Sequence, residues 1–247
     1  MVHRDARAFG SVAEVYDRAR PDYPDPALDW LRRTLDLREG RTVLDLAAGT
    51  GKLTIGLART RARVVAVEPS EGMLARLRAA LPDVEALEGT AEAIPLPDAS
   101  VDAVAVGQAF HWFATEEALA EMQRVLKPSG RLALVWNRRD LDDPAQRALD
   151  GVLDRWERGT PRQRHGTWRD AMEATERFEP LATFELRHEQ RLSFEAVVER
   201  VLSTSFIAAL PGGERAVVAD EVRRATAEFG EPVVLPYVAE LFAYVRR

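Results

Sequence analysis

Cysteine is absent from this chain of 247 residues, which excludes disulfides and thiolate metal sites. Histidine is scarce, with four residues, and neither a histidine pair nor a carboxylate cluster has metal-ligand spacing, so we expect no metal. No apolar run approaches the roughly 20 residues that a membrane-spanning helix needs, and the first residues lack the apolar core of a signal peptide. These absences predict a cytoplasmic protein that does not enter a membrane.

An excess of positive charge is also lacking. The formal net charge is −6, so we expect no general affinity for nucleic acid or for anionic membranes. Hydrophobic residues make up 46% of the chain and charged residues 30%, a composition typical of a soluble globular protein. The length suits one large domain, or one domain with a small appendage, and it leaves the oligomeric state open.

The clearest pattern is a short apolar strand that runs into a glycine turn and then into a helix, over residues 43–52. Gly49 and Gly51 allow a tight turn and let a ligand approach the backbone closely. A Walker phosphate loop is excluded, because Leu46 and Leu53 stand where that motif needs a glycine and a Ser or Thr.

Two ligand classes remain for this turn. A dinucleotide fingerprint that begins at Gly49 would end at Thr54, which is too bulky for the close helix–strand contact of that motif. Asp45 lies directly before the turn, where its carboxylate disfavours a pyrophosphate and favours a ligand that carries positive charge. S-adenosylmethionine (SAM), with an ammonium and a sulfonium group, is such a ligand.

Strand-like and helical segments alternate from residue 41 onward. This rhythm predicts a doubly wound α/β domain whose mostly parallel sheet is covered on both faces. A polar, helical stretch at 138–177 is interpreted as a solvated insertion, and further helices are expected at 194–208 and 211–229. Strands are expected at residues 41–47, 63–68, 84–88, 101–108, 131–137, 183–193 and, as a last edge strand, 233–245.

Polar residues follow four of the expected strands, at the carboxyl ends where α/β sheets bind ligands. Glu68 ends the second strand and suits two ribose hydroxyls, although taken singly it is equally typical of a surface acid. Ala91 and Glu92 follow the third strand and could contact an adenine edge. The fourth strand ends in Gln108 and an aromatic run that reaches Phe113. The four strand ends together are more specific than any one of them.

Several segments together resemble the class I SAM-dependent methyltransferases, namely residues 44–51, 65–70, 88–96 and 124–130. Residues 20–24 and 108–113 are similar to a small-molecule branch that includes trans-aconitate methyltransferase-like proteins. The resemblance implies a seven-stranded, Rossmann-like sheet with an antiparallel last strand. It also implies that the SAM and acceptor pockets lie at the carboxyl edge of that sheet.

The resemblance implies a set of cofactor-binding residues as well. It places the methionine end of SAM at the first glycine turn under the N-terminal segment, the ribose at the second strand, and the adenine beside the second and third strand ends. The residues implied are Tyr16, Arg20, Asp45, Gly49, Gly51, Glu68, Pro69, Met73, Ala91, Glu92 and Gln108. Two positions depart from the family pattern, because Ala47 replaces the usual first glycine and Thr90 stands where many relatives have Asp.

The acceptor is expected to contact residues past the fourth and fifth strands. His111 is either a catalytic base or a structural residue. Arg138 is a candidate clamp for a carboxylate acceptor, whereas Arg139 is more typical of a surface charge. The remaining expected substrate contacts are Trp112, Phe113, Trp136 and Asn137.

We therefore divide the chain into an N-terminal cap or lid (1–40), a SAM-binding core (41–137) and a C-terminal part of the same domain that forms the acceptor pocket (138–247). The expected activity is methyl transfer from SAM to a small-molecule acceptor, an oxygen nucleophile of the carboxylate or hydroxyl type. The alternatives are a non-catalytic SAM- or nucleotide-binding protein and a nucleotide-dependent oxidoreductase, the latter weakened by Thr54. A nucleic-acid methyltransferase is disfavoured by the net charge.

Overall fold

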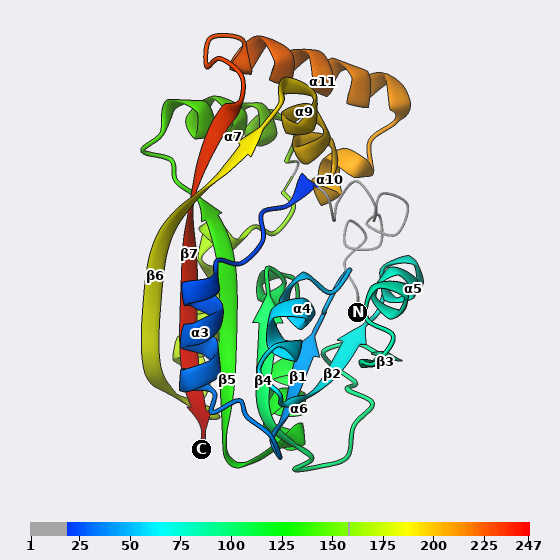
Figure 1. Cartoon of the computed structure of the whole chain (residues 1–247), viewed down its shortest axis with the longest axis vertical. Helices are drawn as coiled ribbons and strands as arrows, with labels where there is room; N and C mark the ends of the chain where they lie inside the picture. Colours follow the sequence, from blue (N-terminus) through cyan, green and yellow to red (C-terminus); the bar gives the residue numbers. More distant parts are fainter. Residues whose placement is uncertain (1–18, 158) are drawn as a thin grey trace.

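Seven strands form one sheet in the computed structural model, which describes residues 19–157 and 159–247. The strand order is β3-β2-β1-β4-β5-β7-β6, with β1 to β5 parallel and β7 antiparallel to both of its neighbours (Figure 1). The strands are Thr42–Leu46 (β1), Arg63–Glu68 (β2), Glu85–Glu88 (β3), Val101–Gly107 (β4), Leu126–Arg139 (β5), Phe178–Leu192 (β6) and Val233–Arg246 (β7). The predicted doubly wound, mostly parallel α/β fold is confirmed.

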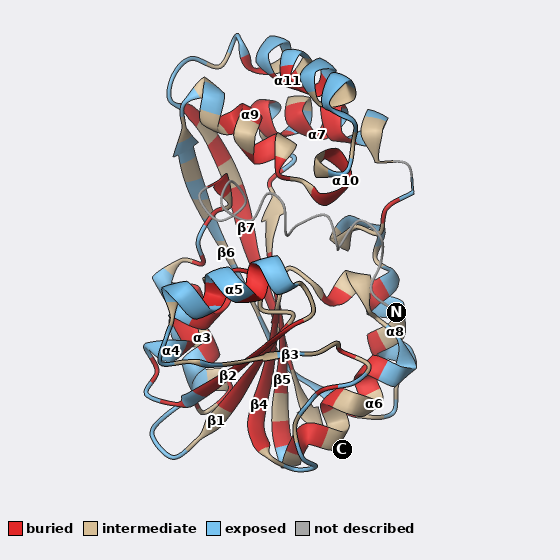
Figure 2. Cartoon of the chain, turned by 90° about the vertical axis from the view of Figure 1, so that its right-hand side faces the viewer, coloured by how far each residue is buried: buried red, intermediate tan, exposed pale blue. Residues whose placement is uncertain are grey.

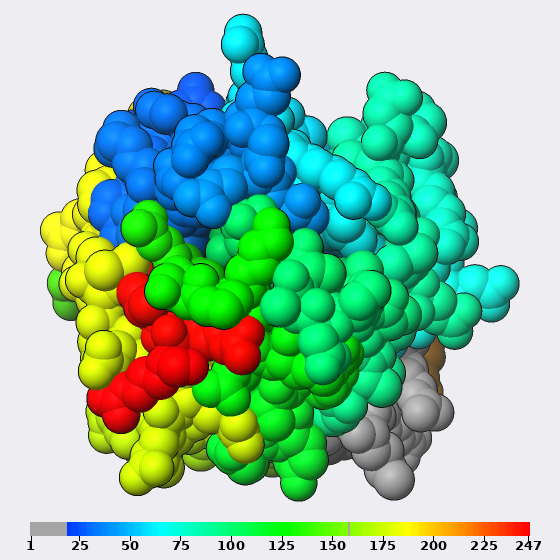
Figure 3. Space-filling view, turned by 90° about the horizontal axis from the view of Figure 1, so that it is seen from below, coloured from blue at the N-terminus to red at the C-terminus, as the bar shows by residue number. Residues whose placement is uncertain are grey.

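The sequence pattern predicts that the last strand of the chain lies at an edge of the sheet. This prediction is wrong, because β7 lies inside the sheet. β7 pairs with β5 on one side and with β6 on the other, and Figure 3 shows the C-terminal end of the chain between these two strands. β6 takes the edge and alternates exposed and half-buried residues, many of them charged. Charged side chains protect a sheet edge from further pairing, so the polar strand suits the edge and the apolar β7 the interior.

Different helices cover the two faces of the sheet, because successive strand residues point to opposite sides. Leu44 of β1 belongs to a core with α6 and α8, while Val43 belongs to a core with α3 and α4. Figure 2 shows the buried residues that run along the central strands between these layers. The helices are Asp25–Thr34 (α3), Lys52–Ala58 (α4), Glu71–Ala80 (α5), Glu116–Val125 (α6) and Thr167–Ala174 (α8). None of the helices in the described residues is both long enough and apolar enough to cross a membrane.

Four further helices form a group that we call the helical lobe, which lies beyond the carboxyl ends of β1 and β4 (Figure 1). β6 and β7 are long strands that extend from the sheet into this lobe. The lobe has its own core, to which Leu149, Val201 and Val222 contribute. Residues 138–177 are therefore not simply a solvated insertion, since α7 buries an apolar stripe in that core. The lobe helices are Pro144–Trp156 (α7), Phe194–Leu202 (α9), Ser205–Ala208 (α10) and Gly212–Thr226 (α11).

Candidate functional site

The glycine turn after β1 reverses the chain within a few residues. Ala47, Gly49 and Gly51 all have left-handed backbones, with φ of 58°, 60° and 95°. A Cβ on Gly51 would make a tight contact of 3.3 Å with the side chain of Leu77 of α5, and the φ of 95° would strain any residue that has a Cβ. Ala47 adopts the same region at a cost of about 1–2 kcal/mol. That strain accounts for the glycine which the family pattern has there.

Asp45 is fully buried at the end of β1, beneath this turn. Its Oδ2 accepts a 2.6 Å hydrogen bond from Oγ1 of Thr54 on α4, whereas its Oδ1 has no hydrogen-bond partner among the described residues. Burial, reinforced by the nearby charge of Glu68, raises the pKa of Asp45 to about 7. A buried carboxylate oxygen without a partner is suited to a cationic group, and the ammonium of SAM fits this requirement.

Glu68 ends β2 and reaches across to the glycine turn. It is 5% exposed, and its two oxygens accept hydrogen bonds from the backbone N–H groups of Gly49 at 2.9 Å and Ser70 at 2.8 Å. Burial raises the pKa of Glu68 despite these two bonds. Each carboxylate oxygen has a second lone pair, so the side chain keeps the capacity to accept from ribose hydroxyls.

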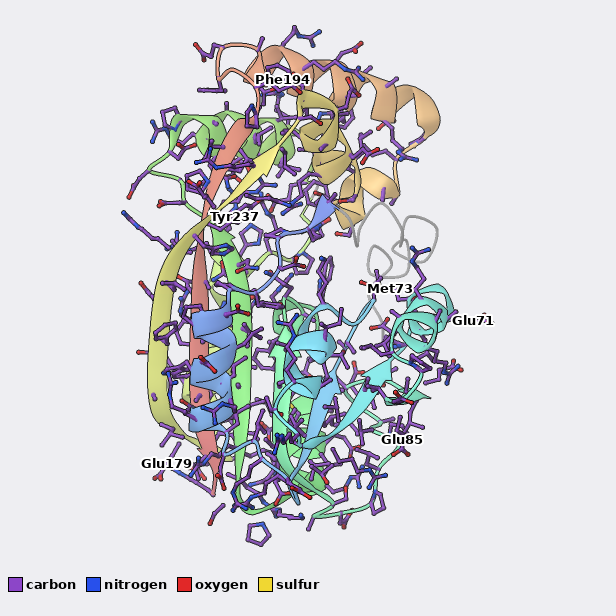
Figure 4. All side chains as sticks on the ribbon, in the orientation of Figure 1. Glu71, Met73, Glu85, Glu179, Phe194 and Tyr237 are labelled. Atoms are coloured by element: carbon purple, nitrogen blue, oxygen red, sulfur yellow. The ribbon has the colours of Figure 1, made fainter. Side chains whose placement is uncertain are left out.

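The residues expected near adenine lie on the loops that follow β2 and β3 and in the first turn of α5. Met73 and Ala91 are buried, while Pro69 and Glu92 are half-buried. The sulfur of Met73 lies 3.8 Å from the position that a Cβ on Gly49 would occupy, and Figure 4 marks Met73 and Glu71 on α5. Their contacts with adenine stay a prediction.

Two adjoining cavities open at the carboxyl edge of the sheet. The first, which we call the turn cavity, is lined by Asp45 and by residues 47–50. The second, the lobe cavity, has a volume of about 190 Å³ and lies between the strand ends and the helical lobe. The residues that line both cavities are Arg20, Gln108, Asn137 and Arg200. A ligand in one cavity is therefore adjacent to a ligand in the other.

The N-terminal segment supplies part of this shared wall. Asn137 Nδ2 donates to the backbone oxygens of Pro21 at 3.4 Å and Asp22 at 3.2 Å, and Lys52 Nζ lies 2.7 Å from a carboxylate oxygen of Asp22. The beginning of the chain as far as residue 18, including Tyr16, is outside the described residues. The described end of the expected lid, residues 19–24, is thus bound at the carboxyl edge.

His111 lines the lobe cavity from a short 3₁₀ helix, Phe110–Trp112 (η2). The indole N–H of Trp136 donates to its Nδ1 at 3.4 Å, so in the neutral ring Nε2 carries the proton. Burial, together with the positive charges of Arg162 and His165, lowers the pKa of His111 to about 3. At neutral pH this imidazole is an uncharged hydrogen-bond donor and a weak base.

The aromatic residues expected to contact the acceptor divide into two groups. Trp112 lines the lobe cavity. Phe113 instead packs edge-on against Phe110, with ring centroids 5.8 Å apart, and Trp136 is 1% exposed and lies 4.3 Å from the ring of Trp168. Trp136 therefore lies in the core, the half-buried Phe113 packs against that core, and neither is among the residues that line the lobe cavity.

The lobe cavity is rich in arginine. Six arginines line it, and the residues are Arg20, Arg138, Arg139, Arg162, Arg164 and Arg200. Arg138, the expected clamp, forms a 2.8 Å ion pair with Glu240 of β7. The sequence context of Arg139 is typical of a surface charge, but in the structure this residue lies in the cavity wall. Asp150 also lines the cavity, so its arginines outnumber its acids.

Thr54 and Arg200 are among the residues of the site that were not anticipated from the sequence. Thr54 excluded a dinucleotide motif, but its spacing of nine from Asp45 gave no sign of their hydrogen bond. Arg200 did carry a signal, because it falls on the helical face of Val197 and Val201, both fully buried. A charged residue within an apolar helical stripe indicates a buried polar site.

Comparison with known proteins agrees with this geometry. Residues 44–134 match the family described as methyltransferase domain. An uncharacterized methyltransferase of Mycobacterium tuberculosis is 42% identical over 236 residues, which cover 94% of this chain and 92% of the relative. A proposed type II methyltransferase from Anaeromyxobacter dehalogenans has a similar structure, with a TM-score of 0.64 and 25% identity over 92% of this chain and 97% of that one.

The fold is also shared with a geranyl diphosphate methyltransferase solved in complex with SAM. The TM-score is 0.53 at 17% identity, over 90% of this chain and 85% of that one. The nearly full-length match to the mycobacterial relative shows the family directly. Together with the glycine turn and the buried acid beneath it, these similarities establish that this chain belongs to the class I SAM-dependent methyltransferases.

Proposed function

We propose that this methyltransferase transfers the methyl group of SAM to an oxygen atom of a small acidic molecule. The observation that carries the proposal is the lobe cavity, which adjoins the turn cavity and has six arginines in its wall. Its volume of about 190 Å³ suits a small acceptor. Guanidinium groups pair with carboxylates, so the wall favours an acid over a neutral alcohol.

The chemistry required of the protein is mainly alignment. SAM, when bound, supplies an activated methyl carbon, and an acceptor oxygen forms its bond to that carbon as the carbon–sulfur bond breaks. A carboxylate needs no general base, because its reference pKa of about 4 keeps it ionised at neutral pH. Gln108 and Asn137, which line both cavities, are positioned to hold the reacting groups in line. His111 then orients the acceptor as a neutral donor.

A labelling experiment tests this proposal. Purified protein is incubated with SAM labelled in its methyl group and with an extract of small metabolites, beside an Asp45→Asn control. A labelled product that releases methanol in mild base is a methyl ester and supports carboxylate methylation. A base-stable product contradicts the ester and indicates a hydroxyl or another acceptor atom. SAM binding without any labelled product favours the non-catalytic alternative.

A further inference from the structure

Arg200 is a buried cation that forms no ion pair with any described residue. It lies on α9, is 4% exposed, and lines both cavities. Its Nε and Nη1 atoms are buried, and within the described chain they have no hydrogen-bond partner. No acid in that part of the chain pairs with its guanidinium. Burying a charge without a partner is energetically costly. The presence of Arg200 at this position therefore indicates that a ligand supplies the missing negative charge.

Arg139 is close to Arg200, and among residues 19–157 and 159–247 it forms no ion pair. Its Nη1 donates to Oε1 of Gln146 at 3.0 Å, which is a neutral acceptor. Burial and the charge of Arg200 lower the pKa of Arg139 to about 10. Asp150 is near enough to oppose this shift, but its two oxygens are taken by Arg162 at 2.7 Å and Arg164 at 2.6 Å. Two like charges therefore share one buried environment.

Two hydroxyl groups lie beside these arginines. Thr204 lines the lobe cavity, and its buried Oγ1 has no partner in the described chain. Tyr237 lies opposite Arg139 in the β5–β7 pairing, and its buried side chain interacts with Arg200. Burial raises the pKa of Tyr237, but the charges of Arg200 and Arg139 and the interaction with Arg200 hold it below its ordinary value. Figure 4 marks Tyr237 on β7, where the strand passes into the helical lobe.

Other arginines of the same wall differ, because carboxylates already compensate them. Arg138 pairs with Glu240 at 2.8 Å. Arg162 and Arg164 share Asp150, and each also lies 2.9 Å from Glu157. Arg139, Arg200 and Thr204, which no described carboxylate pairs with, thus lie together in the cavity, where α9, the residue before α10 and the end of β5 meet.

We propose that Arg139, Arg200 and Thr204 form an anion-binding site that holds a carboxylate of the methyl acceptor. This assignment rests on the proposed function, and it names the residues that select the substrate. Three chain segments supply the site, and a planar guanidinium can bind a carboxylate through two parallel hydrogen bonds. The bound carboxylate supplies the charge that the fold leaves uncompensated.

The test measures binding of a simple anion, without turnover. Succinate is the probe, and succinamide, in which amides replace the carboxylates, is its neutral counterpart. Both are titrated by calorimetry into the full chain with S-adenosylhomocysteine present and at constant ionic strength. Succinate is expected to bind and succinamide is not. If both bind equally, or if neither binds, the anion site is refuted.

Arg200→Met separates a ligand site from a structural cation. Met keeps much of the side-chain volume, so the variant is expected to lose about tenfold or more in succinate affinity. It is also expected to melt about 2–4 °C higher than wild type without ligand, because an uncompensated buried charge is gone. A lower melting temperature with unchanged succinate affinity overturns the proposal. If Arg200→Met does not fold, Arg200→Lys decides, since it keeps the charge but loses the paired hydrogen bonds, and unchanged affinity then refutes the site.

Arg164→Gln is the matched control. It removes one positive charge from the same cavity, but from an arginine that acids already compensate. Its succinate affinity is expected to stay within about threefold of wild type. An equal loss of affinity in Arg164→Gln and Arg200→Met would contradict the site, because it would mean that only the total positive charge of the cavity matters.

SAM binding is titrated separately. Loss of SAM affinity in Arg200→Met with succinate binding intact assigns Arg200 to the cofactor instead. A wild type that binds succinate but not SAM contradicts the proposed function and leaves the anion site standing.

Discussion

The Thr54 hydroxyl holds one oxygen of the Asp45 carboxylate at 2.6 Å, while the other oxygen of that carboxylate has no partner in the described chain. The pair joins the end of β1 to α4 directly under the glycine turn. Thr54, whose bulk argues against a dinucleotide motif, therefore orients Asp45, which lines the turn cavity. If Asp45 pairs with the ammonium of SAM as proposed, its charge state affects both stability and cofactor binding.

Replacing Asp45 by Asn is expected to stabilise the protein without ligand at alkaline pH. The pKa of Asp45 is about 7 in the folded protein, against an ordinary value of 3.8, so the folded protein holds this proton more tightly than the unfolded chain. The associated stability is present below pH 4 and is lost as the pH rises through 7. Asp45→Asn should therefore be more stable than wild type by up to about 4 kcal/mol at pH 8 and similar to it at pH 4. Urea unfolding at both values checks this, with the exposed Asp83→Asn as control.

SAM affinity is expected to fall as the pH is lowered below about 7. The ammonium group requires an ionised Asp45, so each pH unit below its pKa weakens binding up to about tenfold. Thr54→Val removes the hydrogen bond that favours the ionised form, and it should move the midpoint of this dependence to higher pH. Calorimetric titrations of SAM from about pH 5.5 to about pH 8.5 measure the midpoint of this pH dependence, since they span roughly one and a half units on either side of the pKa of Asp45. Identical midpoints in the two proteins would contradict the role of Thr54.

Glu68→Ala is expected to weaken SAM binding by about 2–4 kcal/mol, because charge-assisted hydrogen bonds to the ribose are lost. It should also lower the stability by about 1–3 kcal/mol, since the buried N–H groups of Gly49 and Ser70 lose their acceptor. Glu68→Gln keeps one acceptor oxygen, so its SAM affinity and its stability should both lie between those of wild type and Glu68→Ala. Unchanged SAM affinity in a folded Glu68→Ala protein would remove Glu68 from the cofactor site.

The rate at saturating SAM should not depend on the titration of His111 between about pH 5 and 8, because its pKa of about 3 keeps it neutral throughout. His111→Gln retains a hydrogen-bond donor and should leave the shape of the pH–rate profile unchanged. The measurement is the pH dependence of kcat for both proteins on the acceptor found by labelling. An acid limb near pH 6.5 that disappears in the variant would show that His111 acts as a base on a hydroxyl acceptor.

Much of the fold follows from local sequence patterns. Alternation of strands and helices predicted the parallel sheet, because a buried parallel strand is a short apolar run and its covering helix shows a period of 3.6. The position of β7 was predicted wrongly. The order of the strands depends on which distant segments pair with each other, and β6 and β7 are added to the sheet after the helices of the lobe interrupt the strand–helix alternation. β6 and β7 pair along nearly their whole lengths, and no local pattern encodes that partnership.

The sequence by itself determined the cofactor side of this protein. Asp45, the glycine turn and Glu68 are recognisable because a strand, a turn and a helix start within a few residues of each other must bring their polar groups to one edge. Only the tertiary structure decided the acceptor side. Arg139 and Arg200 are 61 positions apart in the chain and meet because β6 and β7 carry the helical lobe back over the strand ends. Whether such a charge is solvated or buried without a partner depends on that packing.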